Sequence, residues 1–284
     1  MSKPFWKASA NTQAKQMGAL ADARSVLLTA DPREKAAHAR QMRQSWLNTA
    51  QLGEPSGALP DQPARPAVPN LVPPTQVPRR RLGSAAGRGA LLHAVAHIEL
   101  NAIDLAADMI ARFALHSDIA EADRADFITD WTSVCDDEAR HFILLADRLK
   151  ALDIEYGDHP AHNGLWEAAQ TTRDNFPARV AIAPLVLEAR GLDVTPGMIE
   201  RLKSVGDKES VAVLEVIYGE EIGHVAIGAR WFKYLAAKQT ESPESYFQKL
   251  VKTHFRGQIK SPFNEKARTL AGLSRCYYEP LAEF

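Results

Sequence analysis

The chain has 284 residues, of which 24% are charged and 45% are hydrophobic, and its formal net charge is −1. This composition is typical of a globular protein with one large domain and appendages. A nearly neutral chain gives no electrostatic reason to expect binding to nucleic acid or to an anionic membrane. The basic run Arg79–Arg81 is too short to change this expectation.

The sequence also argues against secretion and against membrane insertion. Its two cysteines, Cys135 and Cys276, are too few for a disulfide framework. The N-terminus lacks the apolar core of a signal peptide, and there is no uninterrupted apolar stretch of about 18 residues. We therefore expect a cytoplasmic protein without a membrane-spanning segment.

The first part of the chain predicts a helical extension, residues 1–53, followed by a proline-rich linker, residues 54–86. The extension combines Ala, Arg, Lys and Gln with scattered large apolar side chains, which indicates two short helices. The break between them is predicted at Asp31, which suits a helix cap, and Pro32, which suits a first turn. In the linker, eight prolines exclude a helix, so this segment should run extended as a strap.

Apolar residues then recur at three- and four-residue steps, and strand signals are nearly absent. The predicted class is all-α, with a four-helix bundle over residues 87–240. The third helix should end at Gly191, with Pro196 opening a short helix. The tail, residues 241–284, should pack on the bundle and form a helix over 265–278. The four long helices are expected at about 91–113, 118–149, 165–189 and 208–237.

Six acidic and histidine residues fall inside the apolar stripes of these four helices in an ordered pattern. The second and fourth helices each carry Glu-x-x-His, and the first and third each contribute one Glu. Positions three apart lie within about 60° of each other on a helix, so both side chains of a pair can point at one ion. Four carboxylates and two imidazoles offset much of the charge of two divalent ions, as in the di-iron and di-manganese ferritin-like bundles. The predicted ligands are Glu99, Glu138, His141, Glu188, Glu221 and His224, with Glu138 and Glu221 as bridging, catalytic carboxylates.

The alternative to a metal site is a metal-free bundle with buried salt bridges, but burying four carboxylates without a cation costs several kcal/mol per charge. Near the predicted ligands, His93 and His97 are expected to be satisfied core or surface histidines. Glu220 should face away from the metals or hydrogen-bond a ligand. Cys135 either lines the metal cavity or acts as a small hydrophobic residue.

Two backbone features bear on the same site. Pro184, four residues before Glu188, should remove a helical hydrogen bond and bend the third helix near its ligand. Gly219 and Gly223 lie on one stripe of the fourth helix. They indicate either close helix packing or an access cavity beside the metals, and both interpretations stay open.

The chain resembles the ferritin-like superfamily of di-metal carboxylate proteins. More closely, it is similar to a ferritin-like family known only as a domain of unknown function. The resemblance covers most of residues 83–235 and the linker VPPTQVPRRRLGS, and it implies metal ligands at the six positions but no settled reaction. The architecture is also similar to that of a tRNA-modifying monooxygenase that hydroxylates an isopentenylated adenosine, by fold and ligand pattern alone. The matching stretches are HAVAHIELNAIDLAADMIARF, DDEARHFILLADRL, VLEARGLDVTPGMIERL and EEIGHVAIGARWF.

The leading functional hypothesis is an O₂-dependent oxidoreductase, either a hydroxylase or an oxidase, with two iron ions or manganese at one or both sites. Its partners would be an electron-donor reductase and a small-molecule or modified-nucleotide substrate. One alternative is a ferroxidase or iron-storage protein, which needs a shell of many subunits. Another is a non-enzymatic scaffold that its metals stabilise. The oligomeric state stays open, with a homodimer as the working expectation.

Overall fold

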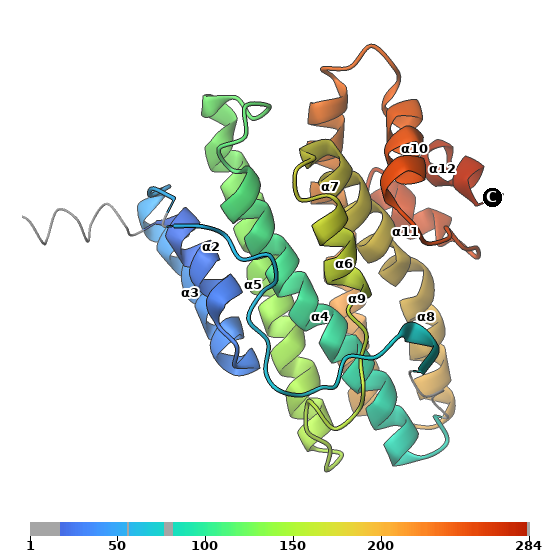
Figure 1. Ribbon diagram of the computed structural model, residues 1–284. Helices are drawn as coiled ribbons and strands as arrows, with labels where there is room; N and C mark the ends of the chain where they lie inside the picture. Colours follow the sequence, from blue (N-terminus) through green and yellow to red (C-terminus); the bar gives the residue numbers. More distant parts are fainter. Residues whose placement is uncertain (1–17, 56, 77–81, 283–284) are drawn as a thin grey trace, which may run out of the picture. The chain divides into compact units, whose positions relative to one another are not determined.

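The computed structural model describes residues 18–55, 57–76 and 82–282, and these are mostly helical (Figure 1). Residues 1–17 of the predicted extension and the basic run Arg79–Arg81 lie outside the described residues. Within the described ranges no β-strand occurs, and the only bridge pairs Leu71 with Ala161 in parallel. The all-α class is therefore confirmed. The elements are α2 (Ala19–Leu28), α3 (Pro32–Thr49), η1 (Pro74–Gln76), α4 (Ala85–Phe113), η2 (Glu121–Asp123), α5 (Arg124–Lys150), α6 (Gly164–Thr171), α7 (Phe176–Ile182), the π-helix η3 (Ala183–Glu188), α8 (Ala189–Ser204), α9 (Lys208–Ala236), α10 (Pro243–His254), α11 (Glu265–Leu270), α12 (Arg275–Tyr278) and η4 (Glu279–Leu281).

The chain forms two compact units. The first contains the described residues within Met1–Pro66 and Ala102–Arg140, and the second contains those within Ala67–Asn101 and His141–Phe284. Helices α4 and α5 therefore each begin in one unit and end in the other. The division predicted from sequence, into extension, linker, bundle and tail, stays a prediction.

In the first unit, α2 and α3 pack side by side (Figure 1). The predicted break between them is confirmed, because Pro32 opens α3 and the Asp31 carboxylate accepts hydrogen bonds from two backbone N–H groups of its first turn, both at 2.9 Å. Near the other end of α3, Trp46 Nε1 donates to Thr129 Oγ1 of α5 at 2.8 Å. The extension thus packs through its own polar contacts as well as its apolar face.

A buried carboxylate ties three segments of the first unit together. Asp104 of α4 is fully buried and pairs with Lys35 of α3, which is 1% exposed, and with Arg65 of the strap at 3.4 Å. Lys35 Nζ also donates to the Ala64 carbonyl of the strap at 3.2 Å. Burial raises the pKa of Asp104 and lowers the pKa of Lys35, while the attraction between the two charges opposes both shifts. Removing Asp104 would therefore leave the charge of Lys35 in a dry interior, and removing Lys35 would leave Asp104 with only the more distant Arg65.

In the second unit, the predicted third helix differs most from the structure. One helix was expected over residues 165–189, whereas the chain forms α6, α7 and η3 there. A new helix begins at α7 because the Asn175 side chain accepts a hydrogen bond from Ala178 N at 3.0 Å and caps it. The α-helical pattern ends again at η3, which contains Pro184 in its first turn. The predicted loss of α-helical hydrogen bonding at Pro184 is confirmed, since the chain forms a π-helix there, and the predicted bend stays a prediction.

The expected helix end at Gly191 and the expected new start at Pro196 are both wrong, since α8 runs through both residues to Ser204. Pro196 has no N–H, so the carbonyl of Leu192, four residues earlier, loses its helical donor. The Asn264 side chain donates to that carbonyl at 3.1 Å and replaces the missing bond. Packing of α8 against α9 supplies the remaining support. Tertiary contacts here outweigh the local sequence signals.

Helix α9 confirms the predicted fourth helix, and Asp207 caps it by accepting a hydrogen bond from the Ser210 backbone at 3.1 Å. Helix α10 has no counterpart among the predicted helices, although Pro243 stands at its first position and Ser242 caps it. The single helix predicted over 265–278 is wrong. The chain forms α11 and α12 there, separated by a turn in which Gly272 has a φ of 75°.

Among the described residues, α4 is long and apolar enough to cross a membrane, with a mean hydropathy of 1.2 over 18 residues. However, 83% of that window is buried within the protein. The core helix of a folded domain passes the same test, so this helix is weak evidence for a membrane span.

Candidate metal site

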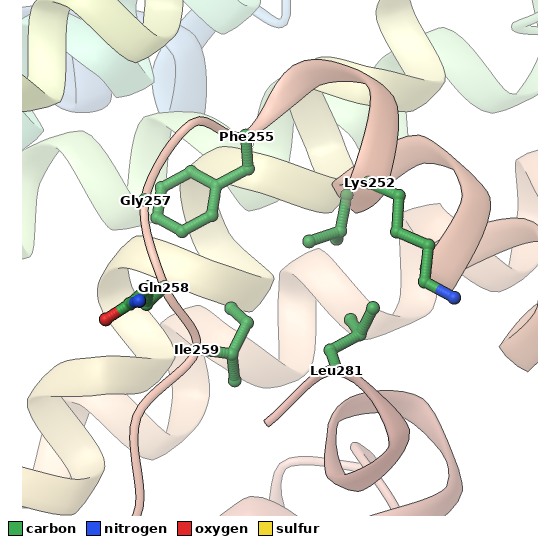
Figure 2. Close-up of a pocket in the computed structure, with 7 residues that line it drawn as sticks. Lys252, Phe255, Gly257, Gln258, Ile259 and Leu281 are labelled. Atoms are coloured by element: carbon green, nitrogen blue, oxygen red, sulfur yellow. The ribbon is translucent and has the colours of Figure 1, made fainter. Parts of the chain in front are cut away.

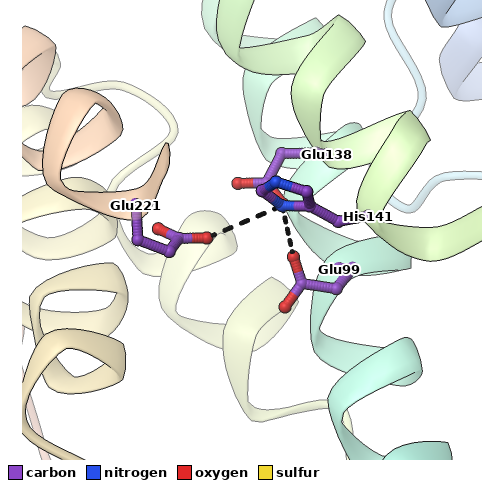
Figure 3. A group of neighbouring side chains, drawn as sticks. All are labelled: Glu99, Glu138, His141 and Glu221. Carbon is purple, nitrogen blue, oxygen red and sulfur yellow. Dashed lines mark hydrogen bonds and ion pairs between the residues drawn. The ribbon is translucent and has the colours of Figure 1, made fainter. Parts of the chain in front are cut away.

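Four buried side chains from three helices converge on one point (Figure 3). Each offers one ligand atom, and these four atoms all lie within 4.8 Å of one another. Glu99 comes from α4, Glu138 and His141 from α5, and Glu221 from α9, and none is more than 8% exposed. Glu138 lies one helical turn before His141, so the geometry of α5 alone places both on one side of the helix.

His141 makes the closest contacts in this group. Its Nδ1 lies 3.1 Å from Glu99 Oε2 and 4.0 Å from Glu221 Oε1. On the opposite edge of the ring, Nε2 lies 2.7 Å from Oε2 of Glu220, which is half-buried on α9. A carboxylate only accepts hydrogen bonds, so Nε2 carries the proton and donates it to Glu220. Of the two predicted roles of Glu220, the structure therefore shows the second: Glu220 is the hydrogen-bond partner of a predicted ligand, His141.

This hydrogen bond has an electrostatic consequence for the other ring nitrogen. A neutral imidazole protonated at Nε2 would present the lone pair of Nδ1 to the Glu99 carboxylate 3.1 Å away, whereas an imidazolium would donate a proton to it. Two electron-rich atoms at this distance attract only if a proton or a cation lies between them. Metal-bound histidines characteristically donate their second N–H to a carboxylate, which is the role that Glu220 takes here.

The donor set fits a divalent metal ion. Three carboxylates and an imidazole combine hard oxygen ligands with a nitrogen ligand, a mixture that suits iron, manganese or zinc. Donors bound to one ion at about 2.0–2.2 Å lie at most about 4.4 Å apart. The largest distance between the four ligand atoms is at most 4.8 Å, which exceeds the largest distance between donors on one ion by only a few tenths of an ångström. Without a cation, three carboxylates this close could not all stay ionised in a buried site.

The other two predicted ligands are not part of this group. His224 borders it, with Nδ1 3.5 Å from Glu221 Oε2 and its ring 5.7 Å from the His141 ring. Glu188 is the last residue of the π-helix η3 and is half-buried. The structure thus brings four of the six predicted residues together. The ligand roles of all six, and the catalytic roles of two, stay predictions.

His93 and His97 have other partners, as expected. His93 accepts a hydrogen bond from the Gly157 backbone at 2.8 Å. His97 Nδ1 lies 2.8 Å from the Tyr156 hydroxyl, and the Tyr156 ring stacks on both imidazoles. These contacts fasten the loop after α5 to α4. Nothing in the sequence singled out Tyr156, because a lone tyrosine in a loop carries no periodic signal.

Cys135 behaves as a small hydrophobic residue. It is fully buried, its thiol donates to the Ile103 carbonyl at 3.6 Å, and it is not a member of the four-residue group. Burial raises the pKa of this thiol well above its ordinary value, so it stays protonated and unreactive at neutral pH.

Residues 28–279 match a protein family described as a protein of unknown function, DUF455. The chain belongs to this family. It is also similar to an uncharacterized protein of Haemophilus influenzae, with 37% identity over 260 residues that cover 88% of this chain and 89% of that protein. No solved structure matches the chain. The predicted placement in a family known only as a domain of unknown function is thus confirmed for DUF455, and the four-residue group is a feature of this member.

Proposed function

We propose that this DUF455 protein is a di-metal carboxylate oxidoreductase that uses O₂ to oxidise a small organic substrate. The observation that carries the proposal is the buried group of Glu99, Glu138, His141 and Glu221. Proteins seldom bury three carboxylates together unless a cation or a proton offsets their charge. The donor chemistry fits iron or manganese, and we propose two ions, with iron at one or both sites.

We further propose a ferritin-like arrangement of the ligand-bearing helices. The predicted ligands come from four helical segments, namely α4, α5, η3 and α9. Glu138 and His141 on α5, and Glu221 and His224 on α9, repeat the Glu-x-x-His spacing of that arrangement. His224, 3.5 Å from Glu221, is positioned to join a second ion next to the gathered four.

Specific tasks can be assigned to the residues of the site. Glu138 and Glu221 each have two carboxylate oxygens and are the candidates to bridge two ions. Glu220 holds the proton on His141 Nε2, which keeps Nδ1 available as a ligand atom. The low exposure of the group excludes bulk water from the ligands. When bound, a pair of ferrous ions supplies the electrons and the open coordination positions that O₂ chemistry needs. An external reductase would return the electrons after each turnover.

The test is an anaerobic titration of metal-free protein with Fe(II), followed by an O₂ pulse. We expect two ions per chain and O₂ uptake faster than that of the same iron in buffer, with an absorbance change that saturates at two equivalents. The variant Glu138→Gln should lose both, whereas Glu167→Gln, an exposed glutamate on α6, should keep both. Uptake no faster than that of free iron would refute the oxidoreductase. Binding of one ion per chain would refute the di-metal site.

A further inference from the structure

In the first unit, α3 holds α5 by hydrogen bonds to both its backbone and its side chains. Arg43 Nη1 donates to the Thr129 carbonyl at 2.8 Å and to the Thr132 hydroxyl at 3.0 Å. Trp46 Nε1, almost one turn further along α3, donates to the Thr129 hydroxyl at 2.8 Å. Two side chains of α3 therefore fasten one turn of α5.

The face of α5 that these bonds hold lies opposite the face that carries Glu138. At about 100° per residue, Thr129 and Glu138 lie about 180° apart around the helix. Asp136, two residues before Glu138, is also on the held face and accepts a hydrogen bond from Arg40 Nε at 3.2 Å. Helix α3 thus fixes the partly exposed side of α5, and this determines where the buried Glu138 carboxylate points.

The same helix also holds α4. Lys35 of α3 pairs with the buried carboxylate of Asp104 on α4. Helices α4 and α5 meet where the Cys135 thiol, one turn before Glu138, donates to the Ile103 carbonyl at 3.6 Å. Helix α3 therefore has fixed points on both helices, and together these points set how α5 is rotated against α4 in the first unit.

The apolar face of α3 is small by comparison. Four of its apolar residues are buried, and two of these are alanines. Burial of apolar surface stabilises without fixing a direction, whereas a hydrogen bond weakens steeply when its angle departs from linear. The contacts of α3 thus specify an orientation of α5 in addition to the stability that they contribute. The buried apolar residues are Ala36, Ala39, Met42 and Trp46.

We propose that α3 is a clamp that sets the affinity of the candidate site for its metal, with Arg43 as the main positioning residue. This inference rests on the metal site of the proposed function. The closed clamp holds Glu138 where a cation can bind it, and without the bonds from Arg43 the helix α5 can rotate and displace the carboxylate. A displacement of about 1 Å can cost up to about 100-fold at a functional site. By thermodynamic linkage, bound metal must strengthen the hold of α3 by the same factor.

The test is the dissociation constant of Mn(II), measured by calorimetric titration of the full chain. Arg43→Met keeps the apolar stem of the side chain and removes its donors, so we expect the dissociation constant to rise at least about tenfold. Thr132→Val removes the acceptor hydroxyl at nearly constant shape and should also weaken binding. Because both variants break one contact, the double variant should bind no more weakly than Arg43→Met alone. The matched control Gln44→Met, at an exposed neighbouring position on α3, should bind as the parent does.

A further variant, Phe247→Leu, separates positioning from stability. Phe247 is buried in the second unit on α10, a helix whose last turn borders a pocket with Val251 and Lys252 (Figure 2). Its truncation should lower the Tm by roughly 3–8 °C and leave the Mn(II) affinity unchanged. Circular dichroism checks that each variant is folded at the temperature of the titration.

Hydrogen exchange tests the linkage in the reverse direction. Mn(II) should slow the exchange of the α3 backbone amides in the parent, and much less in Arg43→Met. A parent that binds no Mn(II) would refute the metal site together with the clamp. Binding by Arg43→Met as tight as that by the parent overturns the clamp alone. The clamp is also overturned if Phe247→Leu loses as much affinity as Arg43→Met, because affinity would then follow stability and not position.

Discussion

The variant Glu138→Gln distinguishes a metal site from a structural salt-bridge cluster. In metal-free protein, the two interpretations predict opposite changes in the free energy of unfolding. Glu138 is fully buried, and its ligand atom lies within 4.8 Å of those of Glu99 and Glu221. Two like charges 4.8 Å apart repel by about 3 kcal/mol at an effective dielectric constant of about 20. In metal-free protein the group therefore bears either this repulsion or the cost of protonating one carboxylate at neutral pH, and Glu138→Gln removes that cost at nearly constant volume. We therefore expect the variant to be at least as stable as the parent.

With metal present, the parent should become more stable than Glu138→Gln. Ligand binding stabilises a folded protein by about 2.7 kcal/mol at a free metal concentration 100 times the dissociation constant. For a chain of this size that gain corresponds to a rise in Tm of roughly 5–10 °C. The parent should show this rise on addition of Fe(II) or Mn(II) under anaerobic conditions, whereas Glu138→Gln should show little of it.

The assay is differential scanning calorimetry of both proteins, and of the control Glu167→Gln, with chelator and with metal at neutral pH. The control should follow the parent in both conditions. If Glu138→Gln destabilises the protein in chelator and metal leaves the parent unchanged, the carboxylates are held by protons and by His141. The metal site would then be refuted, together with the chemistry that depends on it.

Three further predictions concern the fold that carries the site. Asp104→Leu should cost about 3–5 kcal/mol in urea unfolding, because it leaves the charge of Lys35 buried, and adding Lys35→Met should restore most of it; an unrestored double variant would contradict the buried pair. Gly228→Ala should destabilise by about 1–3 kcal/mol, since its Cβ would lie 2.5 Å from the proline of η3. A Cβ atom at Gly223 would meet no atom within 4 Å, so Gly223→Ala should stabilise α9 by up to about 1 kcal/mol. Equal shifts in Tm for Gly228→Ala and Gly223→Ala would refute this contrast. Asn264→Ala should cost about 1–3 kcal/mol, because it leaves the Leu192 carbonyl open, and a loss below about 0.5 kcal/mol would show that water replaces it.

The open space at Gly223, and likewise at Gly219, also bears on the two interpretations of that stripe. Both glycines are exposed, and within the described chain no atom approaches their Cβ positions within 4 Å. Close packing inside the chain therefore does not explain them. A tight contact of α9 is made instead by Gly228, a buried residue that lies against Pro184 of η3 and that the periodicity did not distinguish from its neighbours.

How well the sequence predicted the site depended on whether the geometry was local. The pair Glu138 and His141 follows from the three-residue spacing on one helix, which the backbone enforces wherever the helix forms. Glu99 and Glu221 were predicted because they lie inside the apolar stripes of their helices. Such stripes form the buried faces, and only on buried faces can side chains of different helices meet. Helix α8 could not be predicted in this way. Its continuation through Pro196 depends on Asn264, which is 68 positions further along the chain.

The π-helix also bears on Glu188, which is not part of the gathered group. Glu188 was predicted as a ligand from its place in an apolar stripe, with a disturbance expected at Pro184, and the structure has a π-helix from Ala183 to Glu188, with hydrogen bonds to the fifth residue instead of the fourth. The wider turn rotates each side chain that follows away from its α-helical direction, and such turns occur frequently at functional sites. A second metal ion would need ligands beyond the gathered four, and Glu188 and His224 are the predicted residues that remain. Two ions per chain would therefore assign the π-helix a functional role, and one ion would leave it as the local response to Pro184.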